Sequence, residues 1–599
     1  MIRHLKSLLF AAVLAWAGAS DRLRADPLPL LPANTVVVIG KNADKNEHDA
    51  AAMLQTWLRK ASTSTTGFDI KSDGNAVDWK DKTALAVGHT SLTSPDPRLA
   101  ELNDDGFVIH GNGPVISIAG HTSNATYYAA VSFLDRYAGV RFYMPGELWT
   151  SLPANHEAAF DGNDFVSQPF VVSGFITGIS TRALGDDDWE RRIGGLRRKG
   201  GTHQHDLWTI FPADKLAATQ PEIYPIYNGQ RYIPKDASDQ GWQADFTEPA
   251  TLETAKESIT DYFQANPAAE YIAVSINDNY RWSESEKNQQ IIDEFKAKDP
   301  KGDYKLEATS DIYWRFMNQL AAWLAEKFPS KMLVGLAYGP TRGVPAFKLA
   351  GNIVAFAVLH VAEPPEPMPA PGQLSFLDQW LAAAAHFSNH DWYEGDGYLL
   401  PRIYSDLWSQ FLRSLSARES SAYMHAEAYP NWGFDGPKIY VMAKMWWNPQ
   451  ADPRALTRQF CADMFGPAAQ PMDAYFLELE ALWMQLDYVD GPRRKLNLWS
   501  NQFVTTPVSR AMIQRCHDLL AQAGNLAQTD DQKKRVALFA QCFAFSESLF
   551  ALAEKPADEG LYTHAVALAD ELSKNKWAFY NPAKPLQAIQ ALYKGPAKK

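Results

Sequence analysis

Apolar residues in the first part of the chain follow strand and helix periods in alternation. Three stretches predict strands or a hairpin and two predict amphipathic helices. The predicted elements are strands at 34–40 and 83–88, a hairpin at 106–120 and helices at 46–62 and 124–139. Asn112 and Gly113 occupy the turn of the hairpin, as the tightest hairpin turns favour. Strands that alternate with helices predict a small α/β domain over 28–163.

From Gln168 the pattern changes to short apolar runs, often followed by a helical stretch. About eight such runs are found, which is the strand number of a (β/α)8 barrel. They lie at 170–177, 202–208, 222–229, 271–279, 331–339, 352–360, 386–395 and 420–430. Pro225 makes the third run a doubtful strand. We therefore predict a TIM-like (β/α)8 barrel over 168–449, with its chemistry on the loops that follow the strands.

From about Pro449 onward the apolar residues keep helical spacing. This pattern predicts an α-helical C-terminal domain over 450–599. The expected fold class is therefore α/β: a small α/β domain, then a TIM-like barrel, then a helical domain.

The first residues have the pattern of an export signal. A basic start precedes an apolar stretch at 8–17, and Ala17 and Ala19 form a small-x-small cleavage pattern. We expect a signal peptide over 1–19, cleaved near Ala19 or alternatively after Ala25, and a secreted or periplasmic protein. We expect no later segment to be long and apolar enough to span a membrane.

Composition narrows the classes of partner. The formal net charge of -12 argues against nucleic acid, which favours a basic patch. Aromatic residues are 12% of the chain, which suits a sugar-binding protein, although a large aromatic core explains this content better. The three cysteines, Cys461, Cys516 and Cys542, form no CxxC pair, so no metal or other cofactor is expected. Free thiols and a single disulfide both remain open, as does the oligomeric state.

Several motifs, in their order along the chain, resemble one family. The matching stretches are "GPVISIAGHTSNATYYAAVSFLDRYAGVRFYMPGE", "QPEIYPIYNGQR", "VSINDN", "LAYG" with "RGVP", "HDWYEGDGYLLP" and "AEAYPNWGFDGPKIYVMAKMWWNP". The chain resembles bacterial exported proteins that carry the domain of unknown function numbered 4838. The resemblance covers most of the chain from about Leu28 to Pro449.

The resemblance implies a carbohydrate-active protein. It is similar in layout to α-glucuronidases of glycoside hydrolase family 67 and β-hexosaminidases of family 20, and some members are endo-β-N-acetylglucosaminidases. After "VSINDN" many relatives continue into a cysteine-containing segment, whereas this chain has Ser283 and Ser285. That departure leaves the subfamily and the substrate open.

Glycosidic hydrolysis usually needs two carboxyl groups that flank the scissile bond. Asp278 follows a strongly apolar strand, although an aspartate there can also cap the strand end. Glu427 ends the last barrel-like strand, and a partly apolar wall would raise its pKa toward that of a useful acid. A buried glutamate paired with a basic residue is the other interpretation. Asp391 is the third catalytic candidate, and Glu394 beside it fits a solvated loop better.

Polar and aromatic side chains near the predicted strand ends are candidates for sugar contacts. They are His205, Trp208, Asn277, Asn279, Tyr338, Arg342, Trp392, Tyr393, Tyr429 and Trp432. His203 and His205 alternate, but no further metal ligand accompanies them. Arg342 has the chemistry to clamp a carboxylate or a sulfate, and Glu363 fits a loop.

The sequence therefore predicts an exported glycoside hydrolase that uses paired carboxylates on a polysaccharide or glycan, with an N-acetylglucosaminidase-like or glucuronidase-like activity. Two alternatives are a non-catalytic glycan-binding protein and a polysaccharide lyase, for which His205 and Arg342 would serve. The sugar, the linkage, endo or exo action and the stereochemical outcome stay open.

Overall fold

The structure is a computed structural model, and it describes most of the chain. The described residues are 27–74, 81–152, 158–177, 184, 186–195, 205–359, 361, 376–393, 395, 397–417, 421–488 and 510–595. The predicted signal peptide lies outside them. The chain divides into two compact units, one formed by 1–141 with 151–168 and the other by 142–150 with 169–599.

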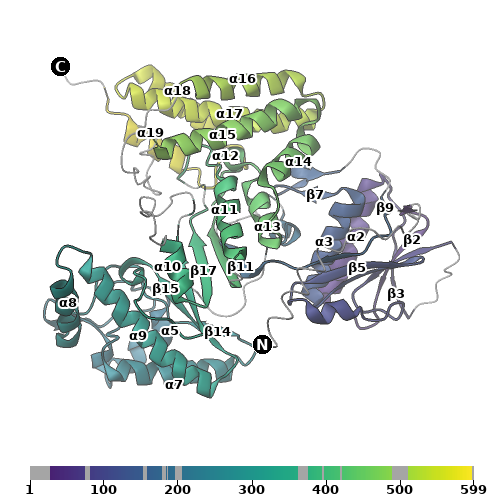
Figure 1. Cartoon of the computed structure of the whole chain (residues 1–599). Coiled ribbons are helices and arrows are strands. Elements are labelled where there is room, and N and C mark those ends of the chain that lie inside the picture. Colours follow the sequence, from purple (N-terminus) through teal and green to yellow (C-terminus); the bar gives the residue numbers. More distant parts are fainter. Residues whose placement is uncertain are drawn as a thin grey trace. The chain divides into compact units, whose positions relative to one another are not determined.

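The first unit is a mixed six-stranded sheet with two long helices (Figure 1). Its strands, in sheet order, are β10 (Phe165–Ser167), β5 (Phe107–Asn112), β6 (Val115–Gly120), β4 (Thr83–Val87), β2 (Thr35–Ile39) and β3 (Ile70–Ser72). The strands β2, β3, β4 and β6 run parallel, and β5 pairs antiparallel with both β6 and β10. The hairpin predicted at Asn112 and Gly113 is the β5–β6 turn. The smaller elements are β1 (Leu28–Pro29), β9 (Ala159–Phe160) and η1 (Pro97–Glu101).

The two helices of this unit begin and end where local chemistry dictates. Helix α2 (Lys45–Ala61) begins with a capping box in which Asp44 and Glu47 satisfy each other's backbone N–H groups. Helix α3 (Ser123–Ala138) ends at Gly139, whose φ of 65° is the left-handed conformation that favours glycine.

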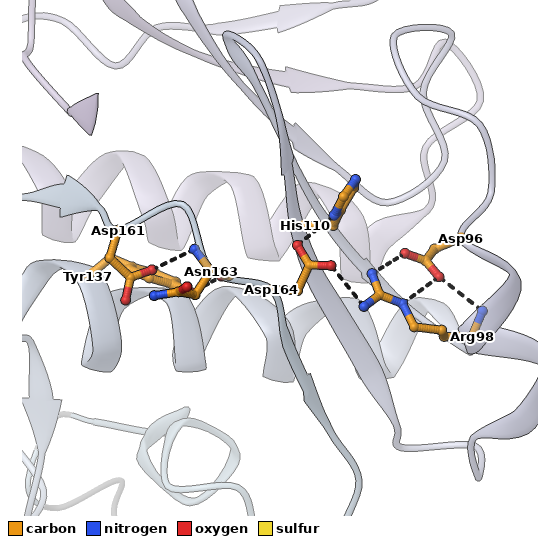
Figure 2. A network of polar contacts seen from close by, with 7 residues as sticks. All are labelled: Asp96, Arg98, His110, Tyr137, Asp161, Asn163 and Asp164. Carbon is orange, nitrogen blue, oxygen red and sulfur yellow. Dashed lines mark hydrogen bonds and ion pairs between the residues drawn. The ribbon is translucent and has the colours of Figure 1, made fainter. Parts of the chain in front are cut away.

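A polar network fastens the last strand region of the first unit to its sheet. Asp164 accepts hydrogen bonds from Arg98 at 2.9 Å and from His110 at 2.6 Å, and Arg98 also pairs with Asp96 at 2.6 Å (Figure 2). The hydrogen bond from Arg98 is the main reason that the pKa of Asp96 is lowered. These side chains are partly exposed, so each pair stabilises the fold only weakly.

The second unit contains a six-stranded, wholly parallel sheet. Its order is β11 (Val171–Thr177), β18 (Ser421–Glu427), β17 (His386–Asp391), β16 (Ile353–Val358), β15 (Met332–Ala337) and β14 (Tyr271–Ala273). The first strand pairs with the last, as barrel strands do. These strands correspond to six of the eight predicted runs.

The other two predicted runs do not join this sheet in the described residues. Residues 202–204 of the second run lie outside the described part, and the run continues into helix α5 (Leu207–Ile210). The third run forms β12 (Ile226–Tyr227), which pairs only with β13 (Gln230–Arg231). The expectation of a closed eight-stranded barrel is therefore confirmed only as a parallel half-barrel. Pro225, which lacks a backbone N–H, accounts for the break in the third run.

Helices connect the parallel strands. The longer ones are α7 (Pro249–Ala265), α8 (Glu286–Lys298), α9 (Tyr304–Lys327), α10 (Phe376–Ala383) and α11 (Ser405–Ser416), and α13 (Lys438–Trp447) follows the last strand. Shorter elements of this unit are η2 (Glu147–Trp149), α4 (Trp189–Arg192), α6 (Ala213–Leu216), η4 (Pro221–Ile223), η5 (Gly339–Thr341) and α12 (Trp432–Asp435). The short strands β7 (Arg141–Phe142) and β8 (Thr150–Ser151) lie where the chain passes between the units.

The C-terminal part is helical, as predicted (Figure 1). Its elements are α14 (Pro453–Phe465), η6 (Gly466–Ala468), α15 (Ala469–Tyr488), α16 (Arg510–Leu526), α17 (Asp530–Glu554), α18 (Glu559–Leu572) and α19 (Lys584–Leu592). The cysteines Cys461, Cys516 and Cys542 are buried free thiols, so the disulfide alternative is excluded.

Helix α17 differs from one expectation. By length and composition alone it could cross a membrane, which the sequence analysis did not recognise. However, 61% of its most apolar window is buried within the structure, as in the central helix of a helical domain. The capping box formed by Thr529 and Gln532 fixes its start.

Ser283 and Ser285 lie in the segment where many relatives were expected to carry cysteine, and both are buried in a polar network. Ser283 donates to Asp245 at 2.7 Å and accepts from the Ile226 N–H at 3.2 Å. Asn288 donates to both Asp245 and Ser285 at 2.8 Å. Hydrogen bonds therefore hold together the segments around β12 and α8.

Candidate active site

The carboxyl ends of the parallel strands bring several predicted site residues together. Tyr338 follows β15, Glu427 ends β18, and Asp278 follows β14 by a short connection. Parallel strands share one carboxyl edge, which is where such folds build their sites. The candidate site consists of these three residues with His205, Trp392, His390 and Tyr429.

Glu427 is held by two hydrogen bonds. The Tyr429 hydroxyl donates to its Oε1 at 2.6 Å, and His390 Nε2 lies 3.2 Å from its Oε2. Its side chain is 20% exposed. Burial raises the pKa of Glu427, but the hydrogen bonds from His390 and Tyr429 outweigh burial, and the net pKa is lowered. The expectation of a pKa raised by an apolar wall is therefore wrong, because polar donors rather than apolar groups line the carboxylate.

Two buried histidines stand behind Glu427. His390 and His425 are directly opposite each other in the β17–β18 ladder, and their Nδ1 atoms are 2.7 Å apart. Burial lowers the pKa of His390, against the raising effect of Glu427, so its ring is neutral. An ionised carboxylate only accepts hydrogen bonds, so His390 carries its proton on Nε2. Its Nδ1 then accepts from His425, which gives a hydrogen-bonded chain that runs from His425 through His390 to Glu427.

Tyr338 links the two catalytic candidates. Burial is the main cause that raises the pKa of its hydroxyl, and the charges of Asp278 and Glu427 both contribute. The hydroxyl is therefore protonated and lies within electrostatic reach of both carboxylates. The Tyr338 ring is 5.8 Å from the ring of His205 and 6.4 Å from that of Trp392.

His205 and Trp392 complete the wall around Tyr338. His205 Nδ1 lies 2.9 Å from the carbonyl oxygen of Ile276, just before Asp278, and its φ of 49° is unusual for a residue other than glycine. The Trp392 ring is 5.8 Å from the His390 ring. The structure thus brings six of the sequence-predicted residues together, Tyr338 and Glu427 among them, with His390 added.

Asp278 and its two neighbours have different roles. The Asp278 side chain is exposed, whereas Asn277 and Asn279 direct their amides to the protein. Asn277 Nδ2 donates to the Trp242 carbonyl at 3.0 Å, and Asn279 Nδ2 donates to the Gln240 carbonyl at 2.6 Å. The prediction that both asparagines bind sugar hydroxyls is therefore wrong, because their donors hold the loop in place.

Asp391 and Tyr393 are buried away from the candidate site. Side chains alternate along a strand, so Asp391 faces the opposite side of β17 from His390. There it adjoins a buried network in which Lys438 contacts Asp435 at 2.7 Å and donates to the Arg402 carbonyl at 3.1 Å. Burial, followed by the charge of Asp391, raises the pKa of Tyr393. We therefore withdraw Asp391 as a catalytic candidate and Tyr393 as a substrate contact.

Trp432 also differs from its prediction. It is the first residue of α12 and is 4% exposed, and its ring packs edge-on against Trp189 at 5.1 Å. The ring therefore belongs to the core. Tyr429, by contrast, is half-buried at the site and its ring lies 5.2 Å from that of Tyr580.

The remaining candidates are not joined to the cluster by any contact between described residues. Trp208 is half-buried in α5, and Arg342 is exposed just after η5. His203, Glu363 and Glu394 lie outside the described residues. Within the described part of the chain, no three histidine, cysteine or acidic side chains gather as metal ligands.

His390 was missed in the sequence, although a signal for it was present. Glu427 and His425 are two residues apart and therefore share one face of β18. The neighbouring run ends in His390-Asp391, so only one of that pair can point to the same side. Trp392 and Tyr393 follow directly after Asp391, and for that reason the sequence favoured Asp391 over His390 as a site residue.

Known proteins are similar to this chain at the level of domain and fold. Residues 185–478 match the family model of a domain of unknown function, DUF4838. A solved family GH115 4-O-methyl-α-glucuronidase, BtGH115A, which has specificity for decorated arabinogalactans, is 11% identical with a TM-score of 0.62. The alignment covers 95% of this chain and 81% of that one.

A second solved structure, that of a GH138 enzyme targeting pectin rhamnogalacturonan II, is 9% identical with a TM-score of 0.39. That alignment covers 94% of this chain and 74% of the other. No curated protein matches the sequence. The chain thus shares its fold with a glycoside hydrolase. The match to the DUF4838 model agrees with the predicted resemblance, but it begins at residue 185, whereas the resemblance was expected to begin at about Leu28.

Proposed function

We propose that this protein is an exported glycoside hydrolase whose reacting carboxylates are Glu427 and Asp278. The single observation that carries the proposal is that Glu427 ends β18 and Asp278 follows β14 at the carboxyl edge of one parallel sheet, with Tyr338 after β15 within electrostatic reach of both carboxylates. Two carboxyl groups that flank one small space are what hydrolysis of a glycosidic bond requires. The fold shared with a GH115 α-glucuronidase agrees with this chemistry.

The surroundings of the two carboxylates differ, and this difference assigns the ionised role and the proton-donor role. Glu427 has a lowered pKa and accepts two hydrogen bonds, so it acts in its ionised form as the nucleophile or the general base. Asp278 is exposed at the same edge of the sheet, so we assign it the second role, protonation of the leaving oxygen. The sequence favours Glu427 as the general acid or its partner, and this assignment makes it the partner.

The reaction then follows one of two balanced courses. If Glu427 is the base, it takes a proton from water while that water attacks the anomeric carbon, and Asp278 protonates the departing oxygen. If Glu427 is the nucleophile, it forms a glycosyl ester while Asp278 protonates the departing oxygen. Water later hydrolyses the ester, and the now ionised Asp278 takes a proton from that water. His390 acts in both courses as a positioning residue, because its Nε2–H fixes the orientation of Glu427.

The substrate is a polysaccharide or glycan, and an N-acetylglucosaminide or a glucuronide are the two leading classes. A screen of purified protein against diverse glycans, with mass-spectrometric detection of products, tests the proposal. Glu427→Gln should lower turnover at least about 10²-fold while the protein stays folded. Glu253→Gln is a matched control, because Glu253 is exposed on α7 and pairs only with Lys256 at 2.7 Å in the described structure.

The screen also separates the alternatives. A lyase would leave an unsaturated sugar that absorbs ultraviolet light, whereas a hydrolase adds one water to each cleaved bond. A glycan-binding protein would retain its ligand without releasing any product. Proton NMR of the first product formed gives the anomeric configuration and decides between the two roles of Glu427.

A further inference from the structure

One aromatic ring at the candidate site is exposed in an unusual way. Tyr280 is 68% exposed, more than any other large hydrophobic side chain in the described part of the chain. It follows Asp278 by two residues, and its ring lies 6.4 Å from that of Tyr338. A single exposed aromatic is common on protein surfaces. The ring is informative only if the loop around Tyr280 holds it in one position.

The loop is fixed on the N-terminal side of Tyr280. The Asp278 N–H donates to Gln240 Oε1 at 3.2 Å. The Asn279 amide donates to the carbonyls of Gln240 and Trp242 at 2.6 and 3.1 Å. The Asn279 side-chain oxygen accepts the Arg281 N–H at 2.8 Å, so this asparagine bridges across Tyr280 itself.

The loop is equally fixed on the C-terminal side. The Arg281 guanidinium lies 3.8 Å above the ring of Tyr227 and donates to the Gly241 carbonyl at 3.4 Å. Trp282 is 6% exposed, and its indole N–H donates to Asn288 at 2.8 Å. Both neighbours of Tyr280 are thus held by contacts with the protein, and Tyr280 extends outward from a fixed support.

Gly339 supplies the second part of the support. Its φ of 50° permits a tight turn after Tyr338, and a Cβ there would lie 3.6 Å from the Tyr280 ring. The edge of the ring therefore rests against bare backbone, while most of the ring stays open to solvent. The rings of Tyr280 and Tyr338 neighbour each other at a tilt of 54°, and Tyr280 lies two residues after Asp278.

We propose that Tyr280 is the platform on which one pyranose ring of the substrate stacks, next to the bond that Asp278 and Glu427 cleave. A pyranose has an apolar face of C–H groups and a rim of hydroxyls, which suits a ring with an apolar body and a polar end. Because the loop already holds this ring in place, the side chain loses little conformational entropy when the sugar binds. The inference rests on the proposed function, because that function identifies the ligand as a sugar. It does not require that the protein hydrolyses the ligand.

Binding is measured in the Glu427→Gln background, so that no substrate is consumed. The probes are chitotetraose and a xylotetraose with a 4-O-methylglucuronic acid branch, which represent the two leading substrate classes. Isothermal titration should give a Kd about tenfold weaker for Tyr280→Ala, equal to ~1.4 kcal/mol, for whichever probe binds. Tyr280→Phe keeps the ring and should retain most of the affinity. Leu477→Ala, which truncates a side chain 50% exposed on α15, should leave the Kd unchanged.

An unchanged Kd in Tyr280→Ala would overturn the inference, and so would failure of both probes to bind. Equal losses in Tyr280→Phe and Tyr280→Ala would assign the effect to the hydroxyl and would also overturn it. The proposed function fails separately: a probe that binds through Tyr280 without being hydrolysed by the native chain would refute hydrolysis and leave the platform intact.

Discussion

Removing the Tyr429 hydroxyl tests the environment of Glu427 without any substrate. In Tyr429→Phe the ring and its contact with Tyr580 remain, while the hydrogen bond to Glu427 is lost. The O–O distance of 2.6 Å is that of a charge-assisted bond. Such a bond contributes roughly 1.5–3 kcal/mol. Because Glu427 is 20% exposed, we expect the lower end, about 1.5–2 kcal/mol of unfolding free energy.

The loss should depend on pH in a defined direction. The pKa of folded Glu427 is lowered below its unfolded value of 4.5, so its bonds stabilise the protein while the carboxylate is ionised. The difference between native and Tyr429→Phe protein should be constant from neutral pH down to about pH 5. It should shrink as the pH falls further, through the folded pKa, because the protonated carboxyl no longer offers a charge.

Urea unfolding followed by tryptophan fluorescence, at several pH values between 7 and 4, measures both effects. Tyr580→Phe is the matched control, since it removes a hydroxyl from the neighbouring ring and should cost less than about 0.5 kcal/mol. Combining Tyr429→Phe with Glu427→Gln in a double-mutant cycle isolates the part of the bond that depends on charge. A loss below about 0.5 kcal/mol, or one that is the same at pH 4 and pH 7, would refute the reasoning.

Three further changes test other parts of the structure. His390→Gln should lower kcat about tenfold or more with little change in KM, because it loosens the positioning of Glu427; an equal rise in KM would instead point to substrate contact. Lys438→Met should cost about 3–5 kcal/mol of unfolding free energy, since it leaves the buried Asp435 without its cation, and a loss under about 1 kcal/mol would contradict this. Ser283→Ala should cost about 1–3 kcal/mol in the same urea assay by removing the donor to buried Asp245, and an unchanged midpoint would count against the serine network.

The sequence predicted the parts of this fold that depend on local pattern. The apolar runs before Tyr338 and Glu427 are strands, and the hairpin at Asn112 and Gly113 forms at the expected turn. The spacing of apolar residues is read from neighbouring positions, so it predicts strands and helices without knowledge of the fold. The third predicted strand failed for a local reason as well, because Pro225 prevents a continuous ladder.

The misplaced residues depend on partners far away in the chain. Asn277 has the chemistry of a sugar ligand, but its amide donates a hydrogen bond to the carbonyl of Trp242, 35 positions earlier. Trp432 has the chemistry of a stacking platform, but in α12 its ring packs against that of Trp189. Neither partner can be identified from spacing, because residues so distant meet only when the sheet and its loops have assembled.

The role of a carboxylate is the property least visible in a sequence. Glu427 would have the raised pKa of a general acid if apolar side chains surrounded it. His390 instead approaches from β17, 37 positions earlier, and is itself kept neutral by burial and oriented by His425. A neutral imidazole can still donate one hydrogen bond, so it stabilises the anion without adding a buried positive charge. The same strand end can therefore hold an acid or a base, and the neighbouring strand decides which one it is.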